Sequence, residues 1–307
     1  MRLHFTSFAA LVVLTIILTP LSAQIHFEGL VYQGSGEPQL DLASSVATSP
    51  DGRHVYTSSY EDNAITIFDR NVLTGNLTFS NSFREGEGGT RGLSSIYAVI
   101  VSPDGNHVYT ANSGSNTIVA FSRDVATGNL TYVQTLTDNV DGVDGLQGIL
   151  FLASSPDGNN IYATGPDENA LAGFSRDVNT GMLEMVEVHR AGVGYLTDFS
   201  YPLSLTVSPD GKNVYAVAYD DAAVNTFTRD TETGALTYSG RMVNGTNGVS
   251  GLNGTYSVFV SPDNKNVYVA GTDDSAVAVF GRDLNTGVLS YIETQSDGTN
   301  GVDGLFG

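Results

Sequence analysis

Oxygen-bearing side chains recur at a spacing of three residues in two segments of the chain, and this pattern could hold a metal ion. The residues concerned are Asp138, Asp141, Asp144, Asp297, Asn300 and Asp303. Carboxylate and carboxamide oxygens are ligands that suit calcium. The spacing differs from the alternating ligands of an EF-hand loop, however, and aspartate beside glycine is common in tight turns. The sequence therefore allows two interpretations, a calcium site or turns that hold no ion.

Further acidic residues share one position of a sequence repeat. They are Asp62, Glu168, Asp221 and Asp274, with Ser115 at the same position. If these side chains lie on one face, they form a negative rim that attracts cations. Solvation of an ordinary surface explains them equally well.

Arginine also recurs at one repeat position, in five copies: Arg70, Arg123, Arg176, Arg229 and Arg282. A catalytic arginine would not need so many copies, so we expect an ion pair or a backbone contact at each one. Exposed pairs of this kind stabilise a protein only modestly. His54 and His107 are expected in turns, and His189 is expected to be solvated.

Other kinds of chemistry have no signal in this sequence. The chain has no cysteine, which excludes disulfides, thiolate metal sites and a cysteine nucleophile. It has no glycine-rich phosphate loop, no metal-binding histidine pair and no serine elbow. The 33 acidic and 13 basic residues give a net charge of -20, which disfavours nucleic acid and anionic membranes as partners.

The residues above are positioned by a repeat of 53 residues. Ser-Pro-Asp-Gly begins at Ser49, Ser102, Ser155 and Ser208, and Ser-Pro-Asp-Asn begins at Ser261. Tyrosine, phenylalanine and glycine also recur every 53 residues, each at its own position of the repeat. We call the residues that share one repeat position a column. Such self-similarity at a fixed period is the signature of a repeat architecture.

Each repeat is expected to form four antiparallel strands. Turn residues such as Pro103-Asp104-Gly105 separate runs that are rich in β-branched and aromatic residues. In the second repeat, these runs are residues 96–101, 106–111, 117–122 and 130–135. Four strands at a period near 50 residues predict a blade of a β-propeller. A blade buries both faces only by stacking, so we expect Val108, Ile161 and Val214 between neighbouring blades.

The N-terminus is typical of a cleaved signal peptide. Arg2 and His4 precede an apolar run at residues 8–18, which is too short to span a bilayer, and Ala23 suits a cleavage site. The sequence therefore predicts a signal peptide at 1–23 and a secreted or periplasmic protein without stable membrane insertion. An uncleaved membrane anchor is the alternative, because the positive flank is weak.

The mature chain, 24–307, is expected to be one propeller domain with five complete blades. The predicted blades are approximately 41–84, 94–137, 147–190, 200–243 and 253–296. Segment 24–36 resembles a fourth strand that closes a propeller, and 297–307 resembles the linker that begins a further blade. We therefore expect a chain truncated from a parent with six or seven blades.

The run Ser-Pro-Asp-Gly-Asn-His-Val-Tyr-Thr-Ala-Asn-Ser-Gly-Ser-Asn-Thr-Ile, at 102–118, resembles the YVTN-type repeats of the lactonase-like propeller family. The resemblance extends over nearly all of the mature chain. It implies a seven-bladed propeller, in a family with sugar-lactone hydrolases, muconate-lactonising relatives and many exported repeat proteins. The matching residues are those that build blades, so no catalytic residue is carried over.

Three functional hypotheses follow. The leading one is a non-enzymatic extracellular module that binds a small molecule, a carbohydrate or a protein partner, because no single site stands out. The alternative is a lactonase-type hydrolase, similar to 6-phosphogluconolactonases, that acts on a sugar lactone or another lactone, with calcium as a conceivable metal. The third is a spacer in a larger surface protein. Unlike polar residues that converge in one place would favour the enzyme.

Overall fold

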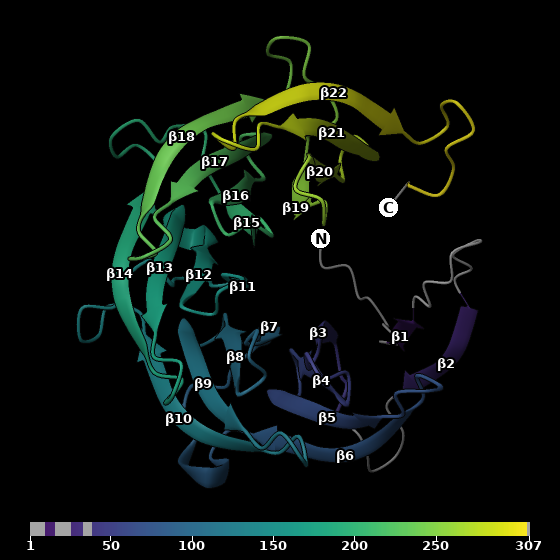
Figure 1. Cartoon of the computed structure of the whole chain (residues 1–307), viewed down its shortest axis with the longest axis vertical. Coiled ribbons are helices and arrows are strands. Elements are labelled where there is room, and N and C mark those ends of the chain that lie inside the picture. Colours follow the sequence, from purple (N-terminus) through teal and green to yellow (C-terminus); the bar gives the residue numbers. More distant parts are fainter. Residues whose placement is uncertain (1–9, 16–25, 33–38, 306–307) are drawn as a thin grey trace, which may run out of the picture. The chain divides into compact units, whose positions relative to one another are not determined.

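A computed structural model describes residues 10–15, 26–32 and 39–305 of the chain. Two compact units divide it: unit 1 comprises residues 1–115 and 119–135, and unit 2 comprises residues 116–118 and 136–307. Each unit is built from four-stranded antiparallel sheets (Figure 1). Because each sheet is one sequence repeat, we call it a blade.

Five blades follow one another along the chain, each with its strands in sequence order. Blade 1 has β3 (Ala43–Thr48), β4 (His54–Ser59), β5 (Ala64–Arg70) and β6 (Leu77–Arg84). Blade 2 has β7 (Ile96–Val101), β8 (His107–Asn112), β9 (Thr117–Arg123) and β10 (Leu130–Thr137). Blade 3 has β11 (Phe151–Ser154), β12 (Asn160–Gly165), β13 (Ala170–Arg176) and β14 (Leu183–Arg190). Blade 4 has β15 (Pro202–Val207), β16 (Asn213–Ala218), β17 (Ala223–Arg229) and β18 (Leu236–Val243). Blade 5 has β19 (Thr255–Val260), β20 (Asn266–Gly271), β21 (Ala276–Arg282) and β22 (Leu289–Ser296).

The predicted all-β fold of four-stranded blades is confirmed, and the strand bounds differ from the prediction by one or two residues. The second strand of blade 2 begins at His107 rather than at Asn106. Asn106 belongs to the preceding turn, because its backbone N–H donates to Oδ1 of Asp104 at 3.1 Å. The N–H of His107 donates instead to Oγ of Ser102 at 3.0 Å, which marks the end of that turn.

The N-terminal part contains one more pair of strands. β1 (Ala10–Thr15) pairs antiparallel with β2 (His26–Tyr32) in a separate two-stranded sheet. The predicted closing strand near Phe27 is thus a strand, but its partner in the structure is β1. The rest of the predicted signal peptide, 1–9 and 16–23, lies outside the described residues.

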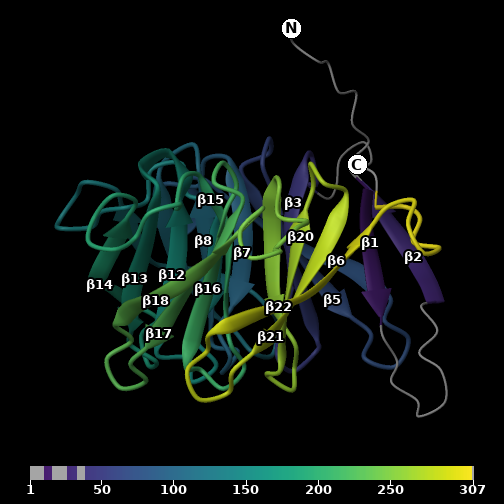
Figure 2. The ribbon, with the colours of Figure 1, turned by 90° about the horizontal axis from the view of Figure 1, so that it is seen from above.

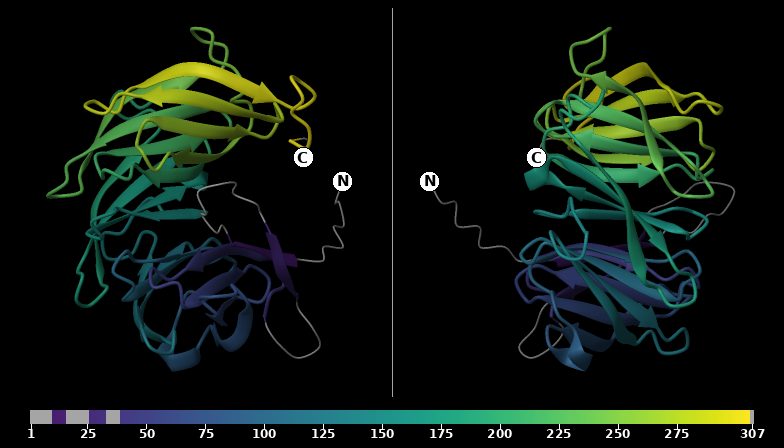
Figure 3. Two further views of the ribbon diagram at one scale, coloured as in Figure 1. Left: turned by 45° about the vertical axis from the view of Figure 1, so that its right-hand side comes forward. Right: turned by 90° about the vertical axis from the view of Figure 1, so that its left-hand side faces the viewer.

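Within each unit, apolar residues of neighbouring blades pack in shared buried clusters. In unit 2, a buried cluster joins Tyr162 and Leu171 of blade 3 to Val214 and Phe227 of blade 4. The expected position of Val214 between blades is therefore confirmed. The first strands β15 and β19 of blades 4 and 5 also lie close together. Oγ1 of Thr255 on β19 donates to the carbonyl of Ala218 on β16 at 2.8 Å. Figures 2 and 3 show the strands of the blades from further directions.

Two 3₁₀ turns, at Glu87–Gly89 and Pro166–Glu168, are the helical elements of the described chain. Neither comes near the length that a membrane-spanning helix requires, and within residues 10–15, 26–32 and 39–305 no helix does.

Candidate functional site

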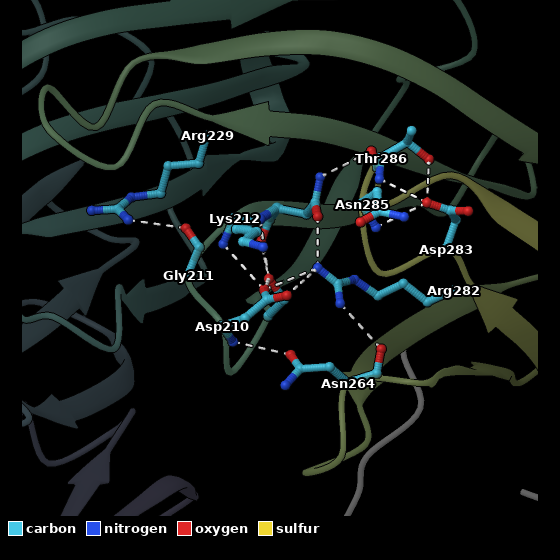
Figure 4. A network of polar contacts seen from close by, with 12 residues as sticks. Asp210, Gly211, Lys212, Arg229, Asn264, Arg282, Asp283, Asn285 and Thr286 are labelled. Carbon is cyan, nitrogen blue, oxygen red and sulfur yellow. Dashed lines mark hydrogen bonds and ion pairs between the residues drawn. The ribbon is translucent and has the colours of Figure 1, made fainter.

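The repeated arginines join neighbouring blades. Figure 4 shows this contact for Arg282, at the end of β21 in blade 5. Its Nη2 donates to both oxygens of Asp210 at 2.9 Å and to Oδ1 of Asn213 at 2.7 Å. Its Nε donates to the Tyr215 hydroxyl at 2.9 Å, and that hydroxyl donates to the carbonyl of Gly287 at 2.7 Å. The guanidinium thus crosslinks blades 4 and 5.

The same contacts recur within both units. Arg229 binds Asp157, Asn160 and Tyr162, and Arg123 binds Asp51, His54 and Tyr56. Arg70 and Arg176 donate to the carbonyls of Gly52 and Gly158. The predicted ion pairs and backbone contacts are therefore confirmed. The expectation that they are exposed is wrong, because the side chains of Arg123, Arg229 and Arg282 are at most 1% exposed.

The buried surroundings fix the protonation of the partners. Burial raises the pKa of the Tyr215 hydroxyl to about 12, so it stays protonated and donates to Gly287. Burial alone would raise the pKa of Asp210, but hydrogen bonds from Ser208 and Arg282 hold it below its usual range. The arginine contacts are thus structural and leave little scope for chemistry.

His54 is not a turn residue, as the sequence suggested, but begins β4 and is 97% buried, with 3% of its surface exposed. Its Nδ1 lies 2.7 Å from Nη2 of Arg123 and accepts the hydrogen bond that asparagine accepts in other blades. His107 likewise begins β8 and is buried. Histidine and asparagine share this repeat position because each offers an acceptor to an arginine.

We expect His54→Asn to remove part of the pH dependence of stability. Burial and the charge of Arg123 lower the pKa of His54 from 6.5. The unfolded chain therefore takes up a proton that the folded chain does not, so stability falls from about pH 7 to about pH 5. Asparagine keeps the acceptor but cannot be protonated. Urea unfolding of both proteins at these two pH values checks this, and an equally steep decline in the variant would contradict it.

Most members of the predicted acidic rim fasten the linkers between blades. Asp62, Asp221 and Asp274 accept backbone N–H groups of Asp41, Ser200 and Asn253 at 2.8, 2.6 and 3.0 Å. Ser115, at the same repeat position, also contacts a linker, but it donates, to the carbonyl of Gly92 at 2.6 Å. These side chains thus have local structural partners. Glu168 departs from this pattern.

Glu168 lies close to two of the six predicted calcium ligands, Asp138 and Asp144. Carboxylate oxygens of Asp138, Asp144 and Glu168 lie within 4.8 Å of one another. Asp141 is instead exposed on the linker, with φ +51°. In the second segment, Asp297 accepts the N–H of Leu305 at 2.9 Å, whereas Asn300 and Asp303 are exposed. The structure therefore brings together part of the first predicted set.

A permanent cation already binds two of these three carboxylates. Arg190, at the end of β14, donates from Nη1 to Asp144 at 2.9 Å and from Nη2 to Glu168 at 2.7 Å. The hydrogen bond from Arg190 lowers the pKa of Asp144 and keeps it ionised. Calcium binding stays a prediction, and the ion would have to compete with Arg190 for the same oxygens.

His189 on β14 is partly buried rather than solvated as expected. Its Nε2 lies 3.1 Å from a carboxylate oxygen of Glu187, and its ring centroid lies 5.5 Å from that of Phe227 in blade 4. His189 therefore contributes to the packing between blades 3 and 4.

Two tyrosines and an aspartate of unit 2 meet where the linkers enter the first strands. Tyr201 directly precedes β15, Tyr219 follows β16 and Asp273 follows β20. The Tyr219 hydroxyl donates to Oδ1 of Asp273 over 3.3 Å. The rings of Tyr201 and Tyr219 pack edge to face with their centroids 6.4 Å apart. We call these residues the Tyr201 cluster.

Tyr201 has an unfavourable backbone conformation for a bulky residue. Its φ is +55°, in the left-handed region, and the neighbouring linkers have Gly148 and Gly254 at this repeat position, both at φ +66°. Its N–H donates to Oδ1 of Asn169 at 2.8 Å, which helps to hold the backbone in place. Leu42 and Ser95 adopt the same conformation at this repeat position, with φ of +49° and +50°, so the conformation belongs to the linker turn. What distinguishes Tyr201 is its exposed aromatic ring.

The cluster combines groups that can perform acid–base chemistry. Asp273 is exposed and offers a carboxylate that can accept a proton from water. The negative charge of Asp273 raises the pKa of Tyr219, so its hydroxyl remains a hydrogen-bond donor. A base beside a donor is the minimum arrangement for attack of water on an ester carbonyl.

Sequence reasoning missed this cluster although a signal was present. Tyr201 interrupts a column that has glycine in the linkers on either side, at Gly148 and Gly254. Tyr219 and Asp273 belong to different columns, and only the fold brings them together.

Comparison with known proteins identifies the family. The model of the family described as "Lactonase, 7-bladed beta-propeller" matches residues 32–135 and 101–252, which is more than half of the chain. The chain belongs to this family. The predicted resemblance to lactonase-like propellers is therefore confirmed.

One relative with a curated name is a protein of Arthroderma benhamiae named "Probable 6-phosphogluconolactonase". It is 31% identical over 137 residues, which are 42% of this chain and 33% of the relative. The chain therefore matches about a third of the length of this relative.

Solved structures from bacteria share the fold. A protein of Bacteroides uniformis, provisionally named 6-phosphogluconolactonase, is 22% identical with a TM-score of 0.73, over 94% of this chain and 79% of the other. The periplasmic gluconolactonase of Pseudomonas aeruginosa is 20% identical with a TM-score of 0.67, over 83% and 70%. These likenesses establish the fold.

The comparisons correct the leading functional hypothesis. A non-enzymatic interaction module was expected because no single catalytic site stands out in the sequence. The family and the named relatives point instead to lactone hydrolysis, which was the alternative. The hypothesis of a non-enzymatic module is therefore wrong.

Proposed function

We propose that this protein is a hydrolase that opens the ring of an unphosphorylated sugar lactone. The observation that carries this proposal is the match of residues 32–135 and 101–252 to the lactonase propeller family. The names of the relatives support a gluconolactone as the substrate class.

We assign the chemistry to the Tyr201 cluster. Asp273 accepts a proton from water as the water oxygen attacks the lactone carbonyl. When the lactone is bound, the Tyr219 hydroxyl directs its one proton away from Asp273 and donates it in a hydrogen bond to the oxyanion that forms on the carbonyl oxygen, which leaves Asp273 free to accept a proton. The ring C–O bond then breaks, and the leaving alkoxide takes up the proton that Asp273 accepted, which regenerates the Asp273 carboxylate and gives the open hydroxy acid. The exposed Tyr201 ring provides an apolar surface for one face of the sugar.

The charge of the protein favours a neutral substrate over a phosphorylated one. The net charge is -20, and the acidic residues Asp220, Asp221 and Asp274 lie close to the cluster in sequence. A phosphate group would be repelled by this field. The predicted signal peptide, 1–23, supports the same choice, because an exported enzyme meets free sugar lactones rather than cytosolic sugar phosphates.

Hydrolysis of glucono-δ-lactone tests the proposal. We expect the protein to accelerate acid release above the spontaneous rate, with kcat on the order of 10 s⁻¹. Glucono-δ-lactone should be preferred over its 6-phosphate ester by about tenfold in kcat/KM, because of the repulsion described above. Titration at constant pH measures both rates, and parallel assays with calcium and with a chelator test the calcium prediction. Absence of acceleration with both lactones would refute the proposal.

A further inference from the structure

An open pocket of about 570 Å³ lies beside β18, the edge strand of blade 4. Tyr195, Tyr238 and Met242 are among the residues that line it. Arg241 and Asp198 face each other in the same pocket and form an ion pair through Nε and Oδ2. We call this the β18 pocket. None of its residues belongs to the Tyr201 cluster.

At the repeat position of Arg241, blade 4 differs from blades 2 and 5. In blade 5, Thr294 occupies the position of Arg241, and its hydroxyl donates to the linker carbonyl of Ser250 at 2.6 Å, which holds the linker against the strand. In blade 2, Thr135 makes the same contact with the carbonyl of Arg91 at 2.6 Å. Blade 4 replaces this contact with the longer Arg241 side chain.

The residue before Arg241 also differs from its counterparts. Gly240 stands where blades 3 and 5 have Glu187 and Glu293. A Cβ atom at Gly240 would meet no atom within 4 Å, so space is open beside it. Gly240 and Arg241 both line the pocket.

The lining combines polar groups with exposed aromatic rings. Arg241 and Asp198 have side chains that are 36% and 34% exposed, and the Tyr238 hydroxyl lies 3.5 Å from Nη1 of Arg241. A guanidinium has five N–H donors and a carboxylate has about four lone-pair positions, so the ion pair can bind further groups without breaking. Tyr195 is 89% exposed and offers a flat apolar face at the rim.

We propose that the β18 pocket binds a neutral sugar. Adjacent hydroxyl groups of a sugar can donate to Asp198 and accept from Arg241, while its C–H face packs on an aromatic ring. An anionic ligand is disfavoured by Asp198 and by the net charge of -20. A volume of about 570 Å³ lies within the usual range of small-molecule sites, about 300 to 1,000 Å³. Through this pocket the protein would bind a saccharide at a site separate from the Tyr201 cluster, to which we assign lactone hydrolysis.

Saturation-transfer NMR and calorimetry with D-glucose, D-galactose, D-mannose, maltose and cellobiose test this proposal. We expect at least one of these sugars to bind with Kd of about 1 mM. Tyr195→Ala should weaken this binding about fivefold. Arg241→Thr, which restores the residue of blades 2 and 5, should have a similar or larger effect. Tyr256→Ala is the matched control, because Tyr256 is also an exposed tyrosine, 40% exposed, but lies on β19.

Three results would overturn the proposal. One is that none of the five sugars binds below about 50 mM. Another is that both pocket variants bind like the wild type. The third is tighter binding of D-glucuronate than of D-glucose, which would indicate an anion site. Sugar binding should persist in Asp273→Asn, so failure of the pocket and failure of the proposed hydrolysis are distinguishable.

Discussion

Replacing Arg282 with alanine is expected to lower the free energy of unfolding by about 3 kcal/mol. The guanidinium is fully buried, whereas its partner Asp210 is 21% exposed. Its removal would leave the carboxylate of Asp210, Oδ1 of Asn213 and the Tyr215 hydroxyl without the donor between them. A buried charge that loses its counter-ion is costly, because water cannot replace the lost hydrogen bonds.

Urea unfolding monitored by circular dichroism measures this effect, and Lys265→Ala is the control. The Lys265 ammonium lies 3.6 Å from a carboxylate oxygen of Asp263, but both side chains are more than half exposed. We expect Lys265→Ala to change stability by less than about 0.5 kcal/mol. Equal effects of the two substitutions would contradict the role that we assign to Arg282.

Arg282→Lys separates charge from geometry. Lysine keeps the positive charge but cannot reproduce the planar arrangement of donors to Asp210, Tyr215 and the carbonyl of Asn264. The free energy of unfolding of Arg282→Lys should therefore lie between those of Arg282→Ala and the wild type.

The blades could be predicted from the sequence because their determinants are local and repeated. The Ser-Pro-Asp-Gly turn is one such determinant: in blade 2, Oγ of Ser102 accepts the N–H of His107 and ends the turn. Each repeat position occurs five times along the chain, so a substitution in one blade does not hide the pattern. Four strands per repeat can therefore be predicted from the sequence alone.

The burial of the arginines could not be predicted, because it depends on a neighbour that lies far away in sequence. Arg282 and Asp210 are 72 residues apart, and both stand in segments that are polar in sequence. His54 was assigned to a turn for the same reason, since its partner Arg123 belongs to the next blade. Contacts between blades follow from packing and not from the local pattern.

The Tyr201 cluster was missed for a related reason. The repeat draws attention to residues that recur in every blade. Tyr201 has no counterpart of its kind in the other blades, and Tyr219 and Asp273 recur only in some of them, as Tyr60, Asp167 and Asp220. Arg241 and Gly240 in the β18 pocket likewise differ from the residues at their positions in the other blades. The positions shared by all five blades are occupied by turns, cores and crosslinks, so the positions that vary between blades are the better guide to function.

Asp273→Asn is expected to lower kcat/KM for glucono-δ-lactone by about 100-fold. Asparagine has nearly the same shape as aspartate but cannot take a proton from the attacking water. Because Asp273 is exposed, the substitution should leave the unfolding midpoint unchanged within about 0.5 kcal/mol. A loss of activity without a loss of stability would assign Asp273 to the chemistry rather than to the fold.

Tyr219→Phe and Glu232→Gln complete this test. Tyr219→Phe removes the hydroxyl that donates to Asp273 but keeps the ring that packs on Tyr201, and should lower kcat by about 100-fold through loss of oxyanion stabilisation. Glu232→Gln removes one negative charge from an exposed turn of blade 4 and should retain full activity. If Asp273→Asn behaves like Glu232→Gln while the wild type hydrolyses the lactone, the catalytic base lies elsewhere in the propeller. A decrease in both cluster variants but not in the turn variant would place the base and the donor at the linker ends of blades 4 and 5.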